Sequence, residues 1–158
     1  RRYDFPARYF FGYAVKLDTN GCFPAVLSRI LTAGLADYVA VDMKNGPEQY
    51  PQTAGVPSFD LEALLESIQL LLESGTDFEL RTTVVEPLHS AQSIAGIRDT
   101  LLPLIHATGK KVPAYYLQGF VDRDTVAFSG LESPDHETLE AYGRLLEPLT
   151  EHLEIRGQ

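Results

Sequence analysis

Four charged residues, Asp18, Asp42, Lys44 and Arg81, lie at or near the ends of separate apolar segments of this sequence. Two carboxylates, an amine and a guanidinium can bind a small ligand that carries both charges, and a carboxylate with an amine can also transfer protons. Each could equally be a polar residue at a strand end, and Arg81 could pair with Glu79, two positions earlier. The functional interpretation is strongest for Asp42, because a charge inside an apolar run needs a partner.

An alternation of apolar segments with turn and capping residues predicts the elements that position these side chains. Pro103 should kink or divide the third helix, and Ser133 should cap the fourth. Either Ser58 or Asp60 could cap the second helix, and residues 152–156 form a short closing strand or an ordered tail. The expected elements are strands over 12–18, 38–43, 78–85 and 112–118, and helices over 24–33, 61–74, 90–107 and 134–147.

Strands that alternate with helices pair in parallel, so the predicted fold class is α/β, a partial (β/α) barrel with about four parallel strands. The carboxyl ends of parallel strands meet at one rim, where we expect the charged residues and Gln118 to converge. A length of 158 residues predicts a single domain over 1–158. Within it, 1–11 is an atypical N-terminal segment, 12–120 holds the barrel units, and 121–158 holds a loop, the last helix and the tail.

The composition excludes several classes of protein. Thirteen Lys and Arg against 22 Asp and Glu give a net charge of -9, so neither nucleic acid nor an anionic membrane is an expected partner. The apolar runs are shorter than the roughly 20 residues of a membrane-spanning helix, and we expect a cytoplasmic protein. The single cysteine, Cys22, excludes an internal disulfide and a multi-cysteine metal cage made by this chain alone. The four histidines form no ligand motif and are spaced like surface and helix-terminus residues.

Four segments occur in a fairly specific order: GYAVKLDTNG at 12–21, DYVAVDMK at 37–44, FELRTTVV at 78–85 and YLQGF at 116–120. In these segments the chain resembles the radical S-adenosylmethionine superfamily. Within it, the chain resembles the activating proteins of glycyl-radical enzymes, especially of the anaerobic ribonucleoside-triphosphate reductase. The closing LEIRG at 153–157 also resembles the tail of that family.

The resemblance implies strands three to six of a partial (β/α)6 barrel, with S-adenosylmethionine and a [4Fe-4S] cluster as cofactors. Reductive cleavage of S-adenosylmethionine in that family gives a 5'-deoxyadenosyl radical, which takes hydrogen from a glycine of the partner glycyl-radical enzyme. Related activases hold a monovalent cation near the carboxylate of S-adenosylmethionine. The residues implied are Asp18, Thr19 and Asp42 for that carboxylate end and cation, Lys44 and Arg81 for the charged or ribose portions, and Gln118 for the nucleoside.

The chain departs from the family at the cluster, because it contains neither the Cys-x3-Cys-x2-Cys loop nor the Gly-Gly-Glu-Pro word. Cys22 cannot substitute. We therefore expect a C-terminal portion of an oxidoreductase, inactive by itself and unable to assemble the cluster. Two other classes remain open: a non-catalytic α/β module that binds a metabolite or a protein, and a lyase or hydrolase that uses Asp42 and Lys44. A half-barrel also exposes its edge strands, which favours a homo-oligomer.

Overall fold

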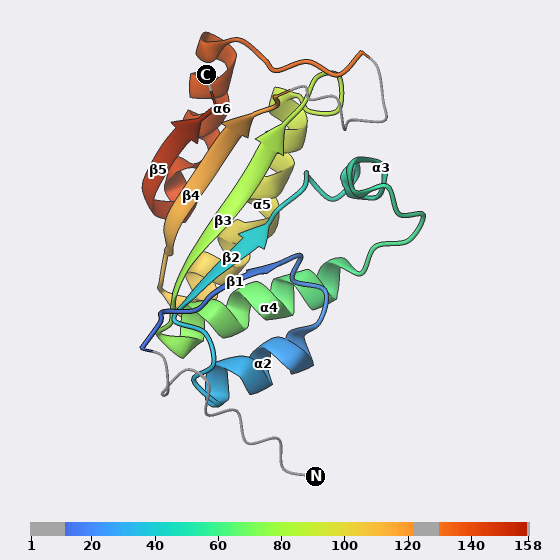
Figure 1. Ribbon diagram of the computed structural model, residues 1–158. Helices are drawn as coiled ribbons and strands as arrows, with labels where there is room; N and C mark the ends of the chain where they lie inside the picture. The colour runs from blue at the N-terminus through green and yellow to red at the C-terminus, as the bar shows by residue number, and fades with distance from the viewer. Residues whose placement is uncertain (1–11, 122–129, 158) are drawn as a thin grey trace.

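The computed structural model describes residues 12–121 and 130–157 (Figure 1). In this part of the chain five strands form one parallel sheet, and each strand pairs with the next in sequence order. The α/β prediction is confirmed, with one strand more than expected, because residues 150–156 pair along β4. The strands are β1 (Lys16–Thr19), β2 (Tyr38–Asp42), β3 (Asp77–Val84), β4 (Val112–Gly119) and β5 (Thr150–Arg156).

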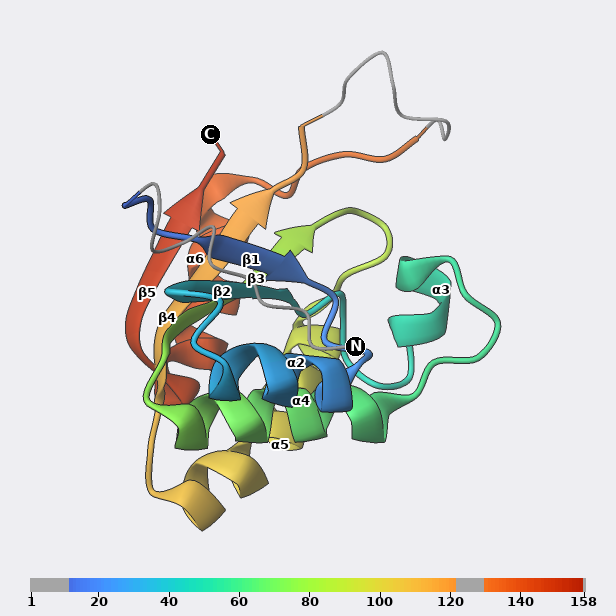
Figure 2. The ribbon, with the colours of Figure 1, turned by 60° about the horizontal axis from the view of Figure 1, so that its bottom comes forward.

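Among the described residues, four longer helices pack along one face of the sheet (Figures 1 and 2). Their apolar residues join those of the strands in a single core, which includes Leu64 and Ile97 from the helices and Leu80 and Leu117 from the strands. The helices are α2 (Pro24–Thr32), α4 (Leu61–Ser74), α5 (Ala91–Thr108) and α6 (His136–Leu146), with the short α3 (Tyr50–Ala54) and the 3-10 turn η1 (Glu147–Leu149).

The opposite face of the sheet is polar because side chains alternate along each strand. In β3, Phe78, Leu80 and Thr82 are buried on the helix side, while Glu79 and Arg81 lie on the other. Parallel register keeps partner residues on one face, so the polar positions of neighbouring strands form continuous rows. This polar face carries the residues that the sequence singled out.

Several expected boundaries differ in the structure. Helix α5 passes through Pro103 without dividing, because Leu101 and Ile105 on either side are both buried and their packing offsets the lost hydrogen bond. Asp135, not Ser133, caps α6, and its carboxylate accepts from the amide of Thr138 at 2.8 Å. A carboxylate at this position also interacts favourably with the helix dipole.

Asp60 rather than Ser58 caps α4, where its side chain accepts from Ala63 N at 3.0 Å. The atypical segment expected at 1–11 lies outside the described residues. Among the helices of the described ranges, none combines the length and the apolar character needed to cross a membrane.

Candidate functional site

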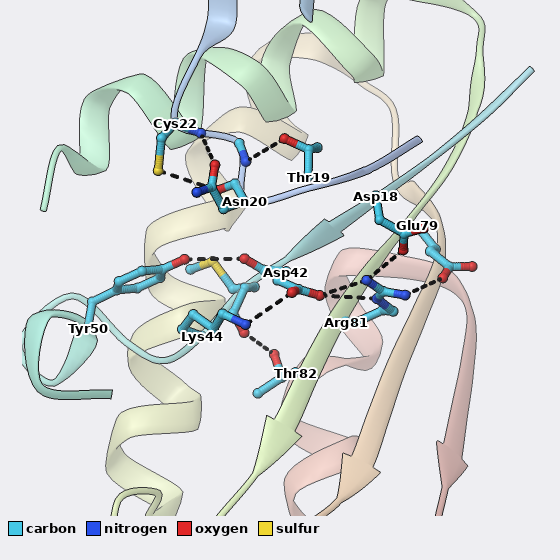
Figure 3. Close-up of polar contacts among 12 residues, drawn as sticks. Asp18, Thr19, Asn20, Cys22, Asp42, Lys44, Tyr50, Glu79, Arg81 and Thr82 are labelled. Atoms are coloured by element: carbon cyan, nitrogen blue, oxygen red, sulfur yellow. Dashed lines mark hydrogen bonds and ion pairs between the residues drawn. The ribbon is translucent and has the colours of Figure 1, made fainter. Parts of the chain in front are cut away.

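Three strands bring the predicted charged residues together on the polar face (Figure 3). Asp42 of β2 and Arg81 of β3 are direct neighbours in register, and Asp18 of β1 is opposite Ala40, two residues before Asp42. Ala40 is fully buried and carries only a methyl group, which leaves room above it for longer side chains from both neighbouring strands. The structure therefore brings together the four charged residues of the prediction, but Gln118 on β4 does not join them.

Arg81 is the centre of this arrangement. Its Nη2 forms an ion pair with Asp18 Oδ1 at 2.8 Å and donates to Asp42 Oδ1 at 2.9 Å, and its Nε donates to the same Asp42 oxygen at 3.1 Å. The alternative pairing with Glu79 exists only as a longer contact of 3.9 Å from Nη1. Arg81 thus bridges carboxylates from two other strands, instead of pairing mainly within its own strand.

Two further cations complete the group. Lys44 Nζ lies 3.0 Å from Asp42 Oδ2, and Lys16 Nζ lies 3.0 Å from Glu79 Oε1. Together Lys16, Asp18, Asp42, Lys44, Glu79 and Arg81 form what we call the ionic cluster, with three positive and three negative side chains. Its charges balance within the chain.

The sequence did not indicate that two members of the ionic cluster, Lys16 and Glu79, pair with each other. Lys16 has the appearance of a strand lysine that reaches for solvent, and Glu79 that of a simple neighbour of Arg81. In the structure the Glu79 side chain is only 4% exposed and also accepts from the hydroxyl of Tyr38 at 2.8 Å. The signal that could have found them is parity, because Lys16, Tyr38 and Glu79 occupy the polar-face positions of β1, β2 and β3.

The environment of Asp42 sets its protonation state. Burial would raise the pKa of this carboxyl, but the hydrogen bonds and charges of Lys44 and Arg81 outweigh it and hold the pKa below its usual range. Burial would likewise lower the pKa of Arg81, and the neighbouring carboxylates raise it instead. A carboxylate with a low pKa is a weak base, so this geometry favours binding of charged groups over proton transfer.

Three buried side chains fix the backbone that carries Asp42 and Lys44. The Tyr50 hydroxyl donates to the Asp42 carbonyl at 3.2 Å, the Thr82 hydroxyl donates to the Met43 carbonyl at 2.7 Å, and His89 Nε2 contacts the Lys44 carbonyl at 2.8 Å. Each comes from a different part of the chain, namely α3, β3 and the segment before α5. The end of β2 is therefore held at three consecutive carbonyls.

His89 is buried, which corrects the expectation that all four histidines lie on the surface or at helix ends. Its Nδ1 accepts from the amide of Val85 at 3.1 Å, so the ring proton is assigned to Nε2, which donates to the Lys44 carbonyl. Burial lowers the pKa of His89 more than its two backbone hydrogen bonds raise it. The neutral imidazole is thus the form that fits this position.

Two predicted residues lie apart from the ionic cluster. The Thr19 hydroxyl accepts from the amide of Gly21 at 3.1 Å and so belongs to the turn after β1 (Figure 3). Gln118 is exposed on β4, in register with Thr83 and Arg156 on the same sheet face. The guanidinium of Arg156, the neighbour of Gln118 on β5, lies 3.4 Å from the centre of the Tyr116 ring.

The donor atoms of this chain do not fit an iron–sulfur cluster. Cys22 is the sole cysteine, and burial together with the nearby charge of Asp60 raises the pKa of its thiol. A helix start does not lower it here, contrary to the simplest expectation from the helix dipole. Within residues 12–121 and 130–157, no group of three or more His, Cys, Asp or Glu side chains is placed to hold a metal ion.

Comparisons with known proteins agree with the resemblance seen in the four sequence segments. No family model matches the chain. A protein of Methanocaldococcus jannaschii named as a glycyl-radical enzyme activating enzyme is 27% identical over 150 residues, which are 92% of this chain and 59% of that protein. The chain thus spans less than two thirds of the length of this relative.

Two solved structures share the fold. A domain of pyruvate-formate lyase-activating enzyme from Bacteroides vulgatus has a TM-score of 0.69 at 15% identity, over 92% of this chain and 83% of that one. A radical SAM methyltransferase from Sphaerobacter thermophilus has a TM-score of 0.71 at 11% identity, over 92% of this chain and 42% of that one. These likenesses agree with the predicted resemblance, and they confirm the α/β fold of parallel strands alternating with helices.

Proposed function

We propose that this chain is the S-adenosylmethionine-facing portion of an activating protein for a glycyl-radical enzyme, of the anaerobic ribonucleotide reductase type. The relative of 27% identity and the shared fold support the family. The observation that carries the proposal is the Asp18–Arg81–Asp42–Lys44 arrangement, which presents both signs of charge on the polar face of the sheet. In a closed barrel that face is the interior.

The exposure of the carboxylates indicates how a zwitterionic methionine group would bind. The Asp18 side chain is 57% exposed and contacts one cation, Arg81, so it is the carboxylate best able to accept an ammonium group. Lys44 and Arg81 are both partly exposed and can donate to a carboxylate. Gln118, with Thr83 and Arg156 beside it, would meet the nucleoside farther along the same face.

When S-adenosylmethionine is bound to a reduced [4Fe-4S] cluster, that pair supplies a 5'-deoxyadenosyl radical. The cysteine ligands for the cluster are not in this chain, so its residues bind and orient the methionine and nucleoside groups and do not start the radical step. A glycyl-radical enzyme is the proposed partner of the complete activity. The chain alone is proposed to be inactive.

The test is a titration of the 15N-labelled chain with S-adenosylmethionine at millimolar concentration, followed by amide chemical shifts. We expect shifts at Lys44, Thr83 and Gln118, on the polar face. Arg81→Gln should weaken binding about tenfold or more, since a charge-assisted hydrogen bond contributes about 1.5 to 3 kcal/mol. Arg98→Gln is the matched control, because Arg98 has a similar exposure but pairs with Asp99 on α5.

The proposal fails if saturating S-adenosylmethionine moves no polar-face amide, or if Arg98→Gln weakens binding as much as Arg81→Gln. S-adenosylhomocysteine, which lacks the sulfonium charge, serves as the comparison ligand. Binding that is strong for methionine-free nucleosides and insensitive to Arg81 would point to a nucleotide-binding module instead.

A further inference from the structure

The guanidinium of Arg81 lies at the point where the carboxylates of Asp18 and Asp42 approach each other. A single nitrogen, Nη2, is 2.8 Å from one carboxylate and 2.9 Å from the other (Figure 3). The two oxygens are therefore within about 6 Å of each other, close enough to repel strongly without a cation between them. In this chain the cation that separates them is a side chain.

Two other observations argue against a second cation at this place. The Thr19 hydroxyl, which the resemblance would make a third oxygen ligand, is turned into the loop and accepts from Gly21. The second oxygen of Asp42 is already bound by Lys44 at 3.0 Å. Since the ionic cluster is neutral as it stands, an added metal ion would carry an unbalanced positive charge.

We propose that Arg81 is a built-in substitute for a monovalent metal cation between Asp18 and Asp42. The chain accordingly binds neither Na+ nor K+ at this place, where the family resemblance would imply a cation. Arginine suits the role because it is always charged and its planar fork can bridge two carboxylates. Removal of the guanidinium should convert the pair of aspartates into a site that takes up an alkali cation.

The test uses the chain without S-adenosylmethionine, so it can fail independently of the proposed function. Thermal unfolding is measured in NaCl, KCl and choline chloride at equal ionic strength, and 23Na line widths are recorded in parallel. For the wild-type chain we expect the same melting temperature in all three salts and no specific 23Na broadening. Arg98→Gln, the matched surface control, should behave like the wild type.

In choline chloride, Arg81→Gln should melt at a lower temperature than the wild-type chain. In NaCl or KCl, the melting temperature of this variant should rise part of the way back to the wild-type value. The double variant Arg81→Gln/Asp42→Asn should lose this salt preference, because one of the two carboxylates is neutral. An equal melting temperature of Arg81→Gln in all three salts would overturn the proposal.

The wild-type measurement keeps the proposal testable if Arg81→Gln does not fold. Specific 23Na broadening by the wild-type chain that Asp42→Asn abolishes would show a metal site beside Arg81, and the proposal would be wrong. Wild-type melting temperatures that depend on Na+ or K+ over choline would contradict it in the same way.

Discussion

Glu79 should be the member of the ionic cluster on which the stability of the sheet depends most. Its side chain is 4% exposed, and it accepts from Lys16 at 3.0 Å and from the Tyr38 hydroxyl at 2.8 Å. A pair of charges at this distance interacts by about 1.4 kcal/mol in water and by about 5.5 kcal/mol at an effective dielectric of 20. Lys16 is 45% exposed, so the true environment lies between these limits.

Glu79→Gln keeps an oxygen that can accept from Tyr38 but leaves Lys16 without its partner. We expect a loss of about 2 to 3 kcal/mol in the free energy of unfolding, between the values for exposed and buried ion pairs. For a chain of this length the melting temperature should fall by about 5 to 10 °C. Glu79→Ala should cost about 1 kcal/mol more, because the Tyr38 hydroxyl then loses its acceptor.

The assay is urea unfolding, with the midpoint read at an unchanged m-value. Glu154→Gln is the matched control on the same sheet face, because Glu154 pairs with Arg156 at 2.9 Å while both side chains are more than two fifths exposed. That pair should contribute less to stability than the pairs of Glu79, because solvent screens both of its charges. If Glu79→Gln costs no more than Glu154→Gln, burial does not set the strength of these pairs and the reasoning is refuted.

Three further predictions follow from other parts of the structure. Because the pKa of His89 is lowered in the folded chain, the unfolded chain binds a proton more readily, and the free energy of unfolding should fall as the pH drops below 6.5. His89→Gln should flatten this part of the pH profile of stability. An unchanged slope in this variant would contradict the prediction. Gly46→Ala should destabilise by about 1 to 3 kcal/mol in urea unfolding, because its Cβ would lie 2.5 Å from the Ser93 carbonyl oxygen, whereas Gly96→Ala meets only contacts of 3.5 Å or more. Anaerobic reconstitution with iron and sulfide should yield no stoichiometric [4Fe-4S] absorbance. Formation of a full cluster would contradict the expectation that a chain with the single cysteine Cys22 cannot assemble one.

The sequence predicts the polar face well because the rule behind it is local. Side chains alternate along a strand, so Asp42 and Lys44 must share a face, as must Glu79 and Arg81. Parallel pairing then makes these faces continuous, and the turn and capping residues place the strand ends to within a few positions. These local rules explain why the strands and most helices were predicted near their observed bounds.

The contacts between strands could not be predicted in the same way. Whether Arg81 pairs with Glu79 or reaches Asp18 and Asp42 depends on the register between strands and on the small side chain of Ala40. The position of His89 depends on the Lys44 carbonyl, 45 residues away, which no local pattern indicates. Residues 152–156 fit a strand and an ordered tail equally well by sequence. The reason is that β5 lies at an edge of the sheet, where most of its polar residues are exposed.

The exposure of the three carboxylates divides the ionic cluster into a structural part and a binding part. Glu79 is nearly buried and has two close partners, so a ligand that took one of them would leave a buried charge unpaired. Asp18 is 57% exposed and Asp42 is 34% exposed, and both share the one guanidinium of Arg81. A ligand ammonium at Asp18 would thus compete only for an exposed contact, while Asp42 and Glu79 keep Arg81 in place. Because two hydrogen bonds to Asp42 hold Arg81 in position before any ligand arrives, the exposed contact with Asp18 can exchange partners at little cost to the fold.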